Sequence, residues 1–228
     1  MARRNRFIPK SVLHYVVQNG HRGDAVFVDD DDKRDYLSNL RTLAHANNVT
    51  LHAYALMPSQ VHMLITASES GGISRLIQML GRIYVRRFNI KHMRSGTLWN
   101  GRFQACAVQS GSAALEVVRY VEASPVRAGI VAQAQDYEWT SYRHHAGIST
   151  SPLITDETLL WALGNTPFER DAAYCEIAKD ALEPSRCNHI ARSVLAGIPI
   201  GCVDFLSDLE LQAGRSLTRK KRGRPIKV

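Results

Sequence analysis

Short apolar segments alternate with longer helical patterns through the first 130 residues of the chain. Residues 51–66 form two short predicted strands broken at 57–59, where a proline removes a backbone donor and a serine favours a turn. Apolar stripes at helical spacing occur before and after this stretch. The pattern predicts an α+β fold, an antiparallel sheet with helices on one face. Its strands are expected at 11–18, within 51–66 and at 103–109, and its helices at 33–46, 73–90 and 112–123.

The pattern changes after residue 130. A segment rich in Ser and Thr at 149–155 has the composition of a linker, and helical patterns follow it. We therefore expect a sheet domain at 1–147, a helical C-terminal extension at 148–214 and a basic tail at 215–228. The helices of the extension are expected at 156–163, 168–182, 186–196 and 202–213.

Composition is that of an ordinary globular protein, with 45% apolar and 22% charged residues. No apolar run approaches the roughly 20 residues that cross a bilayer, and the basic N-terminus lacks the apolar segment of a signal peptide. The four cysteines are scattered without a Cys-x-x-Cys pair, which argues against a zinc knuckle or a disulfide framework. These features predict a cytoplasmic protein with free thiols and no membrane partner.

The net charge of +8 is unevenly distributed. Residues 1–127 hold 17 Lys or Arg and 9 Asp or Glu, residues 128–214 hold 5 and 12, and residues 215–228 hold 7 and none. Basic surfaces often bind nucleic acid, although many basic proteins bind none.

Arginines in two places are candidates for such a surface. Arg82 and Arg86 lie on the helix expected at 73–90, away from its apolar stripe. Arg222 and Arg224 belong to a terminal Arg-Gly-Arg-Pro, which suits an A·T-rich minor groove or is simply a solvated terminus.

Two pairs of polar residues stand out by their spacing. Gln60 and His62 are two apart on an apolar strand, so their side chains share one face of the sheet. Either the pair is structural, with each group hydrogen-bonded, or it holds a metal ion or a phosphate. Tyr120 and Ser124 are four apart near a helix end. A helical tyrosine usually packs, but its hydroxyl can also serve as a nucleophile.

Two further segments allow more than one interpretation. The Gly-bounded segment 94–103 carries Arg102 and two aromatics, and it either stacks bases and holds phosphate or forms a hairpin with Trp99 buried. The acidic run at 29–32 precedes a helix, where negative charge suits the positive end of the helix. We therefore interpret this run as a cap rather than a metal site.

Several stretches together resemble one family, the REP-associated tyrosine transposases. They are a branch of the insertion-sequence-200-like, single-tyrosine HUH transposases, which process single-stranded DNA. The resemblance covers nearly the whole chain and is most specific over 7–145. The matching stretches are 19–27, 51–57, 61–65, 96–103, 119–129 and 139–142, with a basic end at 221–225.

The resemblance implies a ferredoxin-like sheet and a DNA strand transferase. It places the family's metal-binding pair on Gln60 and His62, the nucleophile on Tyr120 and a further metal ligand on Ser124. The expected metal is Mg²⁺ or Mn²⁺, and the expected partner is hairpin-forming single-stranded DNA, bound by a monomer or by a homodimer as in many relatives. Cations needed around the phosphate are expected from Arg102 or Arg127.

The chain departs from the family pattern at two of these positions. Gln60 stands where the family has the first histidine, and Ser124 stands where close relatives have Asn. One hypothesis is therefore a working or weakened nuclease that forms a 5′-phosphotyrosine. The alternative is a hairpin-binding protein that no longer cleaves. A third hypothesis is an RNA-binding module on the same kind of sheet, although the sheet lacks the aromatic pair that such modules display.

Overall fold

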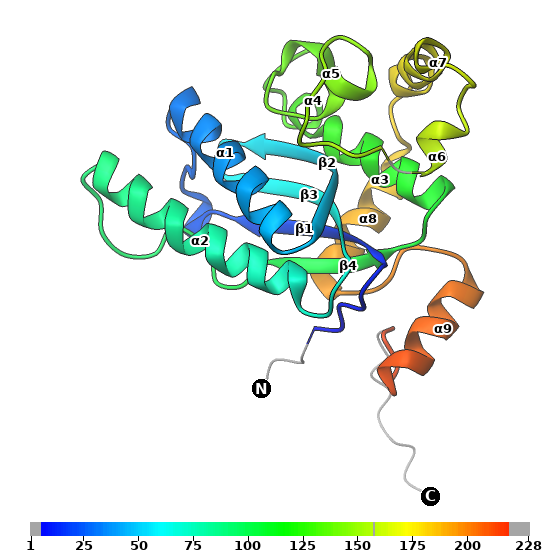
Figure 1. Cartoon of the computed structure of the whole chain (residues 1–228), viewed down its shortest axis with the longest axis horizontal. Coiled ribbons are helices and arrows are strands. Elements are labelled where there is room, and N and C mark those ends of the chain that lie inside the picture. Colours follow the sequence, from blue (N-terminus) through cyan, green and yellow to red (C-terminus); the bar gives the residue numbers. More distant parts are fainter. Residues whose placement is uncertain (1–5, 157, 219–228) are drawn as a thin grey trace, which may run out of the picture.

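The computed structural model describes residues 6–156 and 158–218, and its centre is a four-stranded antiparallel sheet with the order β2-β3-β1-β4 (Figure 1). This order makes β1 and β3 the central strands and leaves β2 and β4 at the edges. The strands lie within two residues of their expected positions. Their bounds are β1 (Leu13–Asn19), β2 (Val49–Met57), β3 (Gln60–Ala67) and β4 (Gln104–Val108).

Seven of the helices among the described residues lie where the sequence pattern predicts them, and two short ones, at 124–127 and 142–145, were not expected. Those among the strands are α1 (Asp30–Ala46), α2 (Gly72–Lys91) and α3 (Ser112–Glu122). Those that follow are α4 (Ser124–Arg127), α5 (Tyr142–His145), α6 (Thr158–Trp161), α7 (Pro167–Lys179), α8 (Pro184–Ala196) and α9 (Val203–Ala213). None of the described helices combines the length and the apolar character needed to cross a bilayer.

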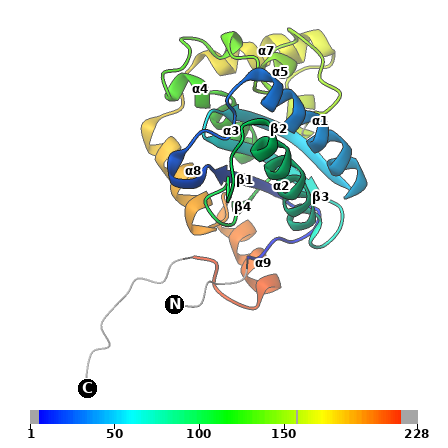
Figure 2. The same ribbon diagram turned by 90° about the vertical axis from the view of Figure 1, so that its left-hand side faces the viewer.

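Helices α1 and α2 cover the sheet face that is turned toward the viewer in Figure 2. Val16 from β1 and Met63 from β3 point toward these helices and are fully buried. The aromatic part of this core comes from both helices, from β2 and from the loops beside them, and its buried members are Phe27, Tyr36, Tyr54, Tyr84, Phe88, Trp99 and Phe103.

The opposite face is covered by α3 and by helices of the C-terminal region. Tyr15, Val17 and Leu64 point toward this side, where α3 presents Ala114, Val117, Val118 and Val121. The α+β class and the antiparallel sheet are thus confirmed, but helices cover both faces rather than one. The reason is visible in β1 and β3, which are buried along nearly their whole length and so need cover on both sides.

Both edges of the sheet are partly covered by other segments. The N–H of Leu56 in β2 donates to the carbonyl of Trp139 over 2.8 Å. At the other edge, the N–H of Ile200 donates to the carbonyl of Ala107 in β4 over 2.8 Å. These contacts pair backbone groups that an exposed edge strand would leave open.

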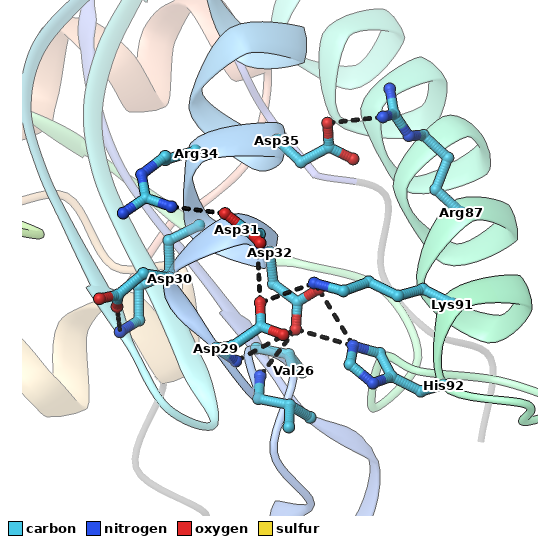
Figure 3. Close-up of polar contacts among 12 residues, drawn as sticks. Val26, Asp29, Asp30, Asp31, Asp32, Arg34, Asp35, Arg87, Lys91 and His92 are labelled. Atoms are coloured by element: carbon cyan, nitrogen blue, oxygen red, sulfur yellow. Dashed lines mark hydrogen bonds and ion pairs between the residues drawn. The ribbon is translucent and has the colours of Figure 1, made fainter.

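The acidic run caps α1, as the sequence predicted (Figure 3). The Asp29 side chain accepts a hydrogen bond from the N–H of Asp32. The Asp32 side chain accepts one from the N–H of Asp29, and the two bonds form a capping box. The Lys91 ammonium lies 2.6 Å from Asp29 Oδ1 and 2.9 Å from Asp32 Oδ1, and His92 Nε2 lies 2.9 Å from Asp32 Oδ2. The lysine thus supplies the cation for these carboxylates and ties the start of α1 to the end of α2.

The loop before β4 buries Trp99, as the second of its two interpretations expects, but residues 94–103 form no hairpin, and Trp99 is instead bridged to Gly20. Trp99 and Phe103 are each only 8% exposed and belong to the core beneath α1 and α2. Neither ring is available to stack on a base.

The helical extension packs on the α3 side of the sheet. Tyr174, Ile190 and Ile200 belong to the same buried cluster as β1 and α3. The division into domains at residue 147 stays a prediction, and the helices beyond that residue share a core with the sheet.

Candidate active site

Strand β3 places Gln60 and His62 on the sheet face that α3 covers. Across the sheet they pair with Asn19 and Val17 of β1, and Val17 is buried against α3. His62 is 7% exposed, whereas Gln60 at the start of the strand is exposed to solvent. Gln60 Oε1 lies 3.2 Å from His62 Nε2, so the pair predicted from spacing also meets in space.

Tyr15 completes the surroundings of His62. Its hydroxyl lies 2.7 Å from His62 Nδ1, and the two rings stack with their centroids 6.0 Å apart. Because Gln60 Oε1 can only accept, His62 Nε2 carries the proton and Tyr15 donates to Nδ1. Burial, and secondly the Arg127 guanidinium, lower the pKa of His62 to about 3. The imidazole is therefore neutral at physiological pH.

The end of α3 brings Tyr120 to the same place. The Tyr120 ring meets the Tyr15 ring edge-on with a centroid distance of 5.9 Å, so Tyr15 contacts both His62 and Tyr120. Burial, and then the neighbouring Tyr120 hydroxyl, raise the pKa of Tyr15 well above its ordinary value. Tyr15 is 1% exposed, whereas Tyr120 is half-buried, so Tyr120 is the tyrosine that a substrate can reach.

Arg127 packs across Tyr120 from the short helix α4. Its guanidinium carbon lies 3.8 Å from the centroid of the Tyr120 ring, and it also donates to the Tyr120 carbonyl. Its Nη2 lies 2.9 Å from Ser124 Oγ. The Ser124 hydroxyl in turn donates to the Tyr120 carbonyl over 3.2 Å. One residue separates the end of α3 from the start of α4, and helical backbone bonds cross the junction, so residues 120, 124 and 127 lie on one side of a nearly continuous helical segment.

The other predicted DNA-binding arginines do not gather here. Arg82 and Arg86 are exposed on α2, which covers the opposite face of the sheet. Arg102 is exposed in the loop before β4, and this loop contacts the end of β1 that pairs with Gln60. Arg222 and Arg224 lie outside the described residues.

The first half of the chain matches a known protein family. The family described as "Transposase IS200 like" matches residues 9–124, just over half of the chain. The chain belongs to the IS200-like transposase family. The matched span runs from before β1 to Ser124 and so contains Gln60, His62 and Tyr120. The family predicted by resemblance is thereby confirmed.

Two solved structures are similar to this IS200-like transposase. A REP-associated tyrosine transposase bound to a REP hairpin has a TM-score of 0.53 and 16% sequence identity, and the match covers 70% of this chain and 93% of that one. A protein from Deinococcus radiodurans R1, described as a candidate transposase, has a TM-score of 0.35 and 22% identity, with 57% and 92% covered. The first likeness supports the fold. No curated protein matches the chain.

The family is one of metal-dependent transposases, so the donor atoms matter. Gln60 Oε1 and His62 Nε2 lie 3.2 Å apart, a separation that suits two ligands of one ion. One oxygen ligand and one nitrogen ligand are compatible with a divalent cation. Ser124 instead bonds Arg127, and its oxygen is shared with a guanidinium.

Two residues of this region escaped the sequence analysis. Tyr15 sits in an apolar strand, and nothing local marks it as a partner of His62. Glu122 did leave a signal, because it continues the apolar stripe of α3 four residues after Val118. Its buried carboxylate accepts from Ser141, His145 and Tyr174.

Proposed function

We propose that this IS200-like transposase cleaves and rejoins hairpin-forming single-stranded DNA, with Tyr120 as the nucleophile. The observation that carries the proposal is the meeting of Tyr120, Tyr15 and His62 at one end of the sheet in a member of a transposase family. A half-buried tyrosine beside a metal-binding type of residue pair suits phosphoryl transfer.

The proposed step exchanges one ester bond at phosphorus for another. The Tyr120 phenolic oxygen, giving up its proton, forms a bond to phosphorus, and the bond from phosphorus to the 3′ oxygen breaks. The leaving 3′ oxygen takes up a proton and becomes a free hydroxyl. The product is a 5′-phosphotyrosine, which a 3′-hydroxyl of another strand can attack in the reverse sense.

We assign Arg127 to the neutralisation of the phosphate. Its guanidinium already lies over the Tyr120 ring, so a phosphate next to the Tyr120 hydroxyl would be within its reach. Gln60 and His62 would hold a divalent cation, Mg²⁺ or Mn²⁺, which supplies Lewis-acid stabilisation of the phosphate when bound. When Nε2 of His62 holds the cation, the proton would move to Nδ1 and be donated to the Tyr15 hydroxyl. Tyr15 would thus remain a fixed partner for the other nitrogen of the ligating histidine.

The family and its structural relative support the proposed substrate class. The REP-associated transposase of similar fold is bound to a REP hairpin, which supports a hairpin as the substrate here. Arg102 lies near the Gln60 end of the sheet and is the next candidate for a backbone contact. Arg82 and Arg86, on the far face of the sheet, would contact a more distant part of the DNA or a second segment of it.

The test is a covalent-transfer assay. A hairpin oligonucleotide labelled at its 3′ end is incubated with the protein and Mn²⁺, and the label should move to the protein in a denaturing gel. A copy labelled at its 5′ end should instead give a shorter free strand with a 3′-hydroxyl. Tyr120→Phe should abolish both products.

Tyr142→Phe is the matched control, because Tyr142 is another partly buried tyrosine packed on the same side of the sheet. It should leave the transfer intact. An adduct that survives in Tyr120→Phe would remove Tyr120 from the nucleophile's role.

A binding protein without cleavage activity is the second candidate. Gln60 in the place of an imidazole and the Ser124–Arg127 bond both favour it, since they leave His62 as the single strong metal ligand. Hairpin binding would then persist in a chelator and weaken steeply with salt, while no adduct forms. In that case Gln60→His is informative, because restored transfer identifies the altered pair as the defect.

An RNA-binding module is disfavoured by the packing. Such modules stack bases on an open sheet face, whereas helices cover both faces of this sheet over the described residues. DNA and RNA hairpins of one sequence, compared in the same binding assay, separate the two possibilities.

A further inference from the structure

A second group of ligand atoms lies away from Tyr120, where α5 meets the segment that leads to α6. His144, His145 and Asp156 each offer one ligand atom, and these atoms all lie within 4.8 Å of one another. The Asp156 oxygen is 3.2 Å from His144 Nε2 and 3.8 Å from His145 Nε2. Ligands of a tetrahedral ion with bonds of about 2.1 Å are separated by roughly 3.4 Å, so both distances are close to those of a bound set.

His145 is held in the orientation of a metal ligand. Its Nδ1 lies 2.6 Å from Glu122 Oε1, so Nδ1 donates to a buried carboxylate. Its side chain is 1% exposed, and Nε2 has no hydrogen-bond partner among the described residues. A carboxylate on one ring nitrogen and an open second nitrogen is the arrangement by which proteins orient histidines toward zinc.

A cavity of about 300 Å³ opens in front of these atoms and leaves room for an ion with its waters. Asp156 and Asp171 line it together with His144 and His145, and Arg170 is the guanidinium on its wall. That guanidinium is engaged by the Gly164 carbonyl and the Trp161 ring. The cavity therefore has an excess of negative charge, as a cation site requires.

The other His and Asp cluster of the described residues differs in this respect. Asp29, Asp32 and His92 surround the Lys91 ammonium, which already neutralises them. No Lys or Arg nitrogen of the described residues makes an ion pair with Asp156.

We propose that His144, His145 and Asp156 form a binding site for a divalent transition metal, with Zn²⁺ as the best match. Two imidazole nitrogens and one carboxylate suit Zn²⁺ better than Mg²⁺, which prefers oxygen ligands. Water completes the coordination. The backbone N–H of Ser151 lies 3.2 Å from His144 Nδ1, and ligation through Nε2 replaces this contact because Nδ1 then carries the proton.

The site would join three parts of the chain. His144 and His145 end α5, Asp156 follows the 149–155 segment, and Glu122 behind His145 belongs to α3. A bound ion would fix the segment between the sheet and the extension and stiffen the helix that carries Tyr120. Its role is structural, and it is separate from the Gln60–His62 pair.

The experiment uses the full chain stripped of metal with a chelator and then freed of the chelator. Zn²⁺ is titrated by calorimetry, and Co²⁺ by its visible absorption, at about pH 8, where fewer protons compete with the metal for its ligands than at neutral pH. We expect the site at His144, His145 and Asp156 to give the intense absorption of four-coordinate Co²⁺, and Zn²⁺ to raise the melting temperature. Asp156→Asn and His144→Gln, both at half-buried positions, should each weaken binding about tenfold or more.

His62→Gln and Asp29→Asn are the controls, because they alter the other two candidate metal-binding groups. Both should leave the affinity for Zn²⁺ and the Co²⁺ absorption of this site unchanged. Two results would overturn the proposal: the absence of binding at micromolar metal in the folded wild-type protein, or binding that survives Asp156→Asn and His144→Gln but disappears in His62→Gln. Far-UV circular dichroism of each variant establishes that it is folded.

Discussion

His62 and His145 are both almost fully buried, yet their surroundings give them opposite properties. His62 is bonded at both ring nitrogens, by the Tyr15 hydroxyl and by Gln60 Oε1. His145 is bonded at Nδ1 by Glu122, while Nε2 has no hydrogen-bond partner among the described residues. Both histidines lie against α3, near Tyr120 and Glu122 respectively.

The difference in charge follows from these neighbours. Burial and the Arg127 guanidinium lower the pKa of His62 to about 3. Burial also acts against a charge on His145, but the carboxylates of Glu122 and Asp156 outweigh it and raise the pKa of His145. The charge of a buried histidine is thus decided by which residue the fold places beside it, and burial alone does not predict it.

The largest effect is expected at the carboxylate that distinguishes the two regions. Glu122→Ala leaves the buried donors of Ser141, His145 and Tyr174 without an acceptor. Because each unsatisfied buried donor costs about 1–3 kcal/mol, the free energy of unfolding should fall by roughly 3–5 kcal/mol. Urea denaturation followed by circular dichroism measures it.

Glu116→Ala is the matched control on the same helix. Glu116 pairs with Arg186, and the two side chains are 24% and 49% exposed, so the pair contributes less than about 1 kcal/mol. Equal losses in the two variants would mean that the buried network around Glu122 adds nothing special to stability.

The second prediction uses pH in the presence of a chelator. Between pH values of about 3 and 6.5 the unfolded chain binds a proton at His62 and the folded chain does not, so stability falls with acidity by up to about 1.4 kcal/mol per pH unit. At His145 the sign is opposite. Its contribution is fully present below about pH 6.5 and is lost as the pH rises through the raised pKa.

Urea denaturation from about pH 4.5 to 8.5 separates the two contributions. His62→Gln should flatten the acid side of the stability curve, and His145→Gln should flatten the alkaline side. Burial also lowers the pKa of His14 to about 4. Some loss of stability at acid pH should therefore remain in His62→Gln. If both variants change the same side, the contrast between the two histidines is wrong.

The smallest effect is expected from one hydroxyl. Tyr15→Phe removes the partner of His62 Nδ1 and should lower the free energy of unfolding by about 1 kcal/mol. It should also raise the Mn²⁺ concentration needed for half-maximal adduct formation by about tenfold, because His62 loses the group that orients it.

Tyr36→Phe is the control for that measurement. Tyr36 is equally buried, but its hydroxyl bonds Gln18 on the other side of the sheet. Tyr36→Phe should lower the free energy of unfolding by a similar amount without changing the Mn²⁺ concentration needed for adduct formation. A shift of the Mn²⁺ requirement in Tyr36→Phe as well would reduce the role of Tyr15 to general stability.

Much of the fold was predictable because its signals are local. The strands follow from apolar runs of the right length, α1 from its apolar stripe and its acidic cap, and the break near Pro125 from the chemistry of proline. The expectation of helices on one face was incomplete. Both faces of β1 and β3 are apolar, but only the packed structure shows which helices cover each of them.

The candidate site likewise combines features that the sequence predicts with contacts that it does not. Alternation along one strand determined that Gln60 and His62 share a face, and helical spacing determined that Tyr120 and Ser124 lie together at one helix end. Only the tertiary structure decided that Tyr15 bonds His62 and that Glu122 bonds His145. Spacing within one element is set by backbone geometry, whereas these contacts depend on strand register and on how distant segments close against the sheet.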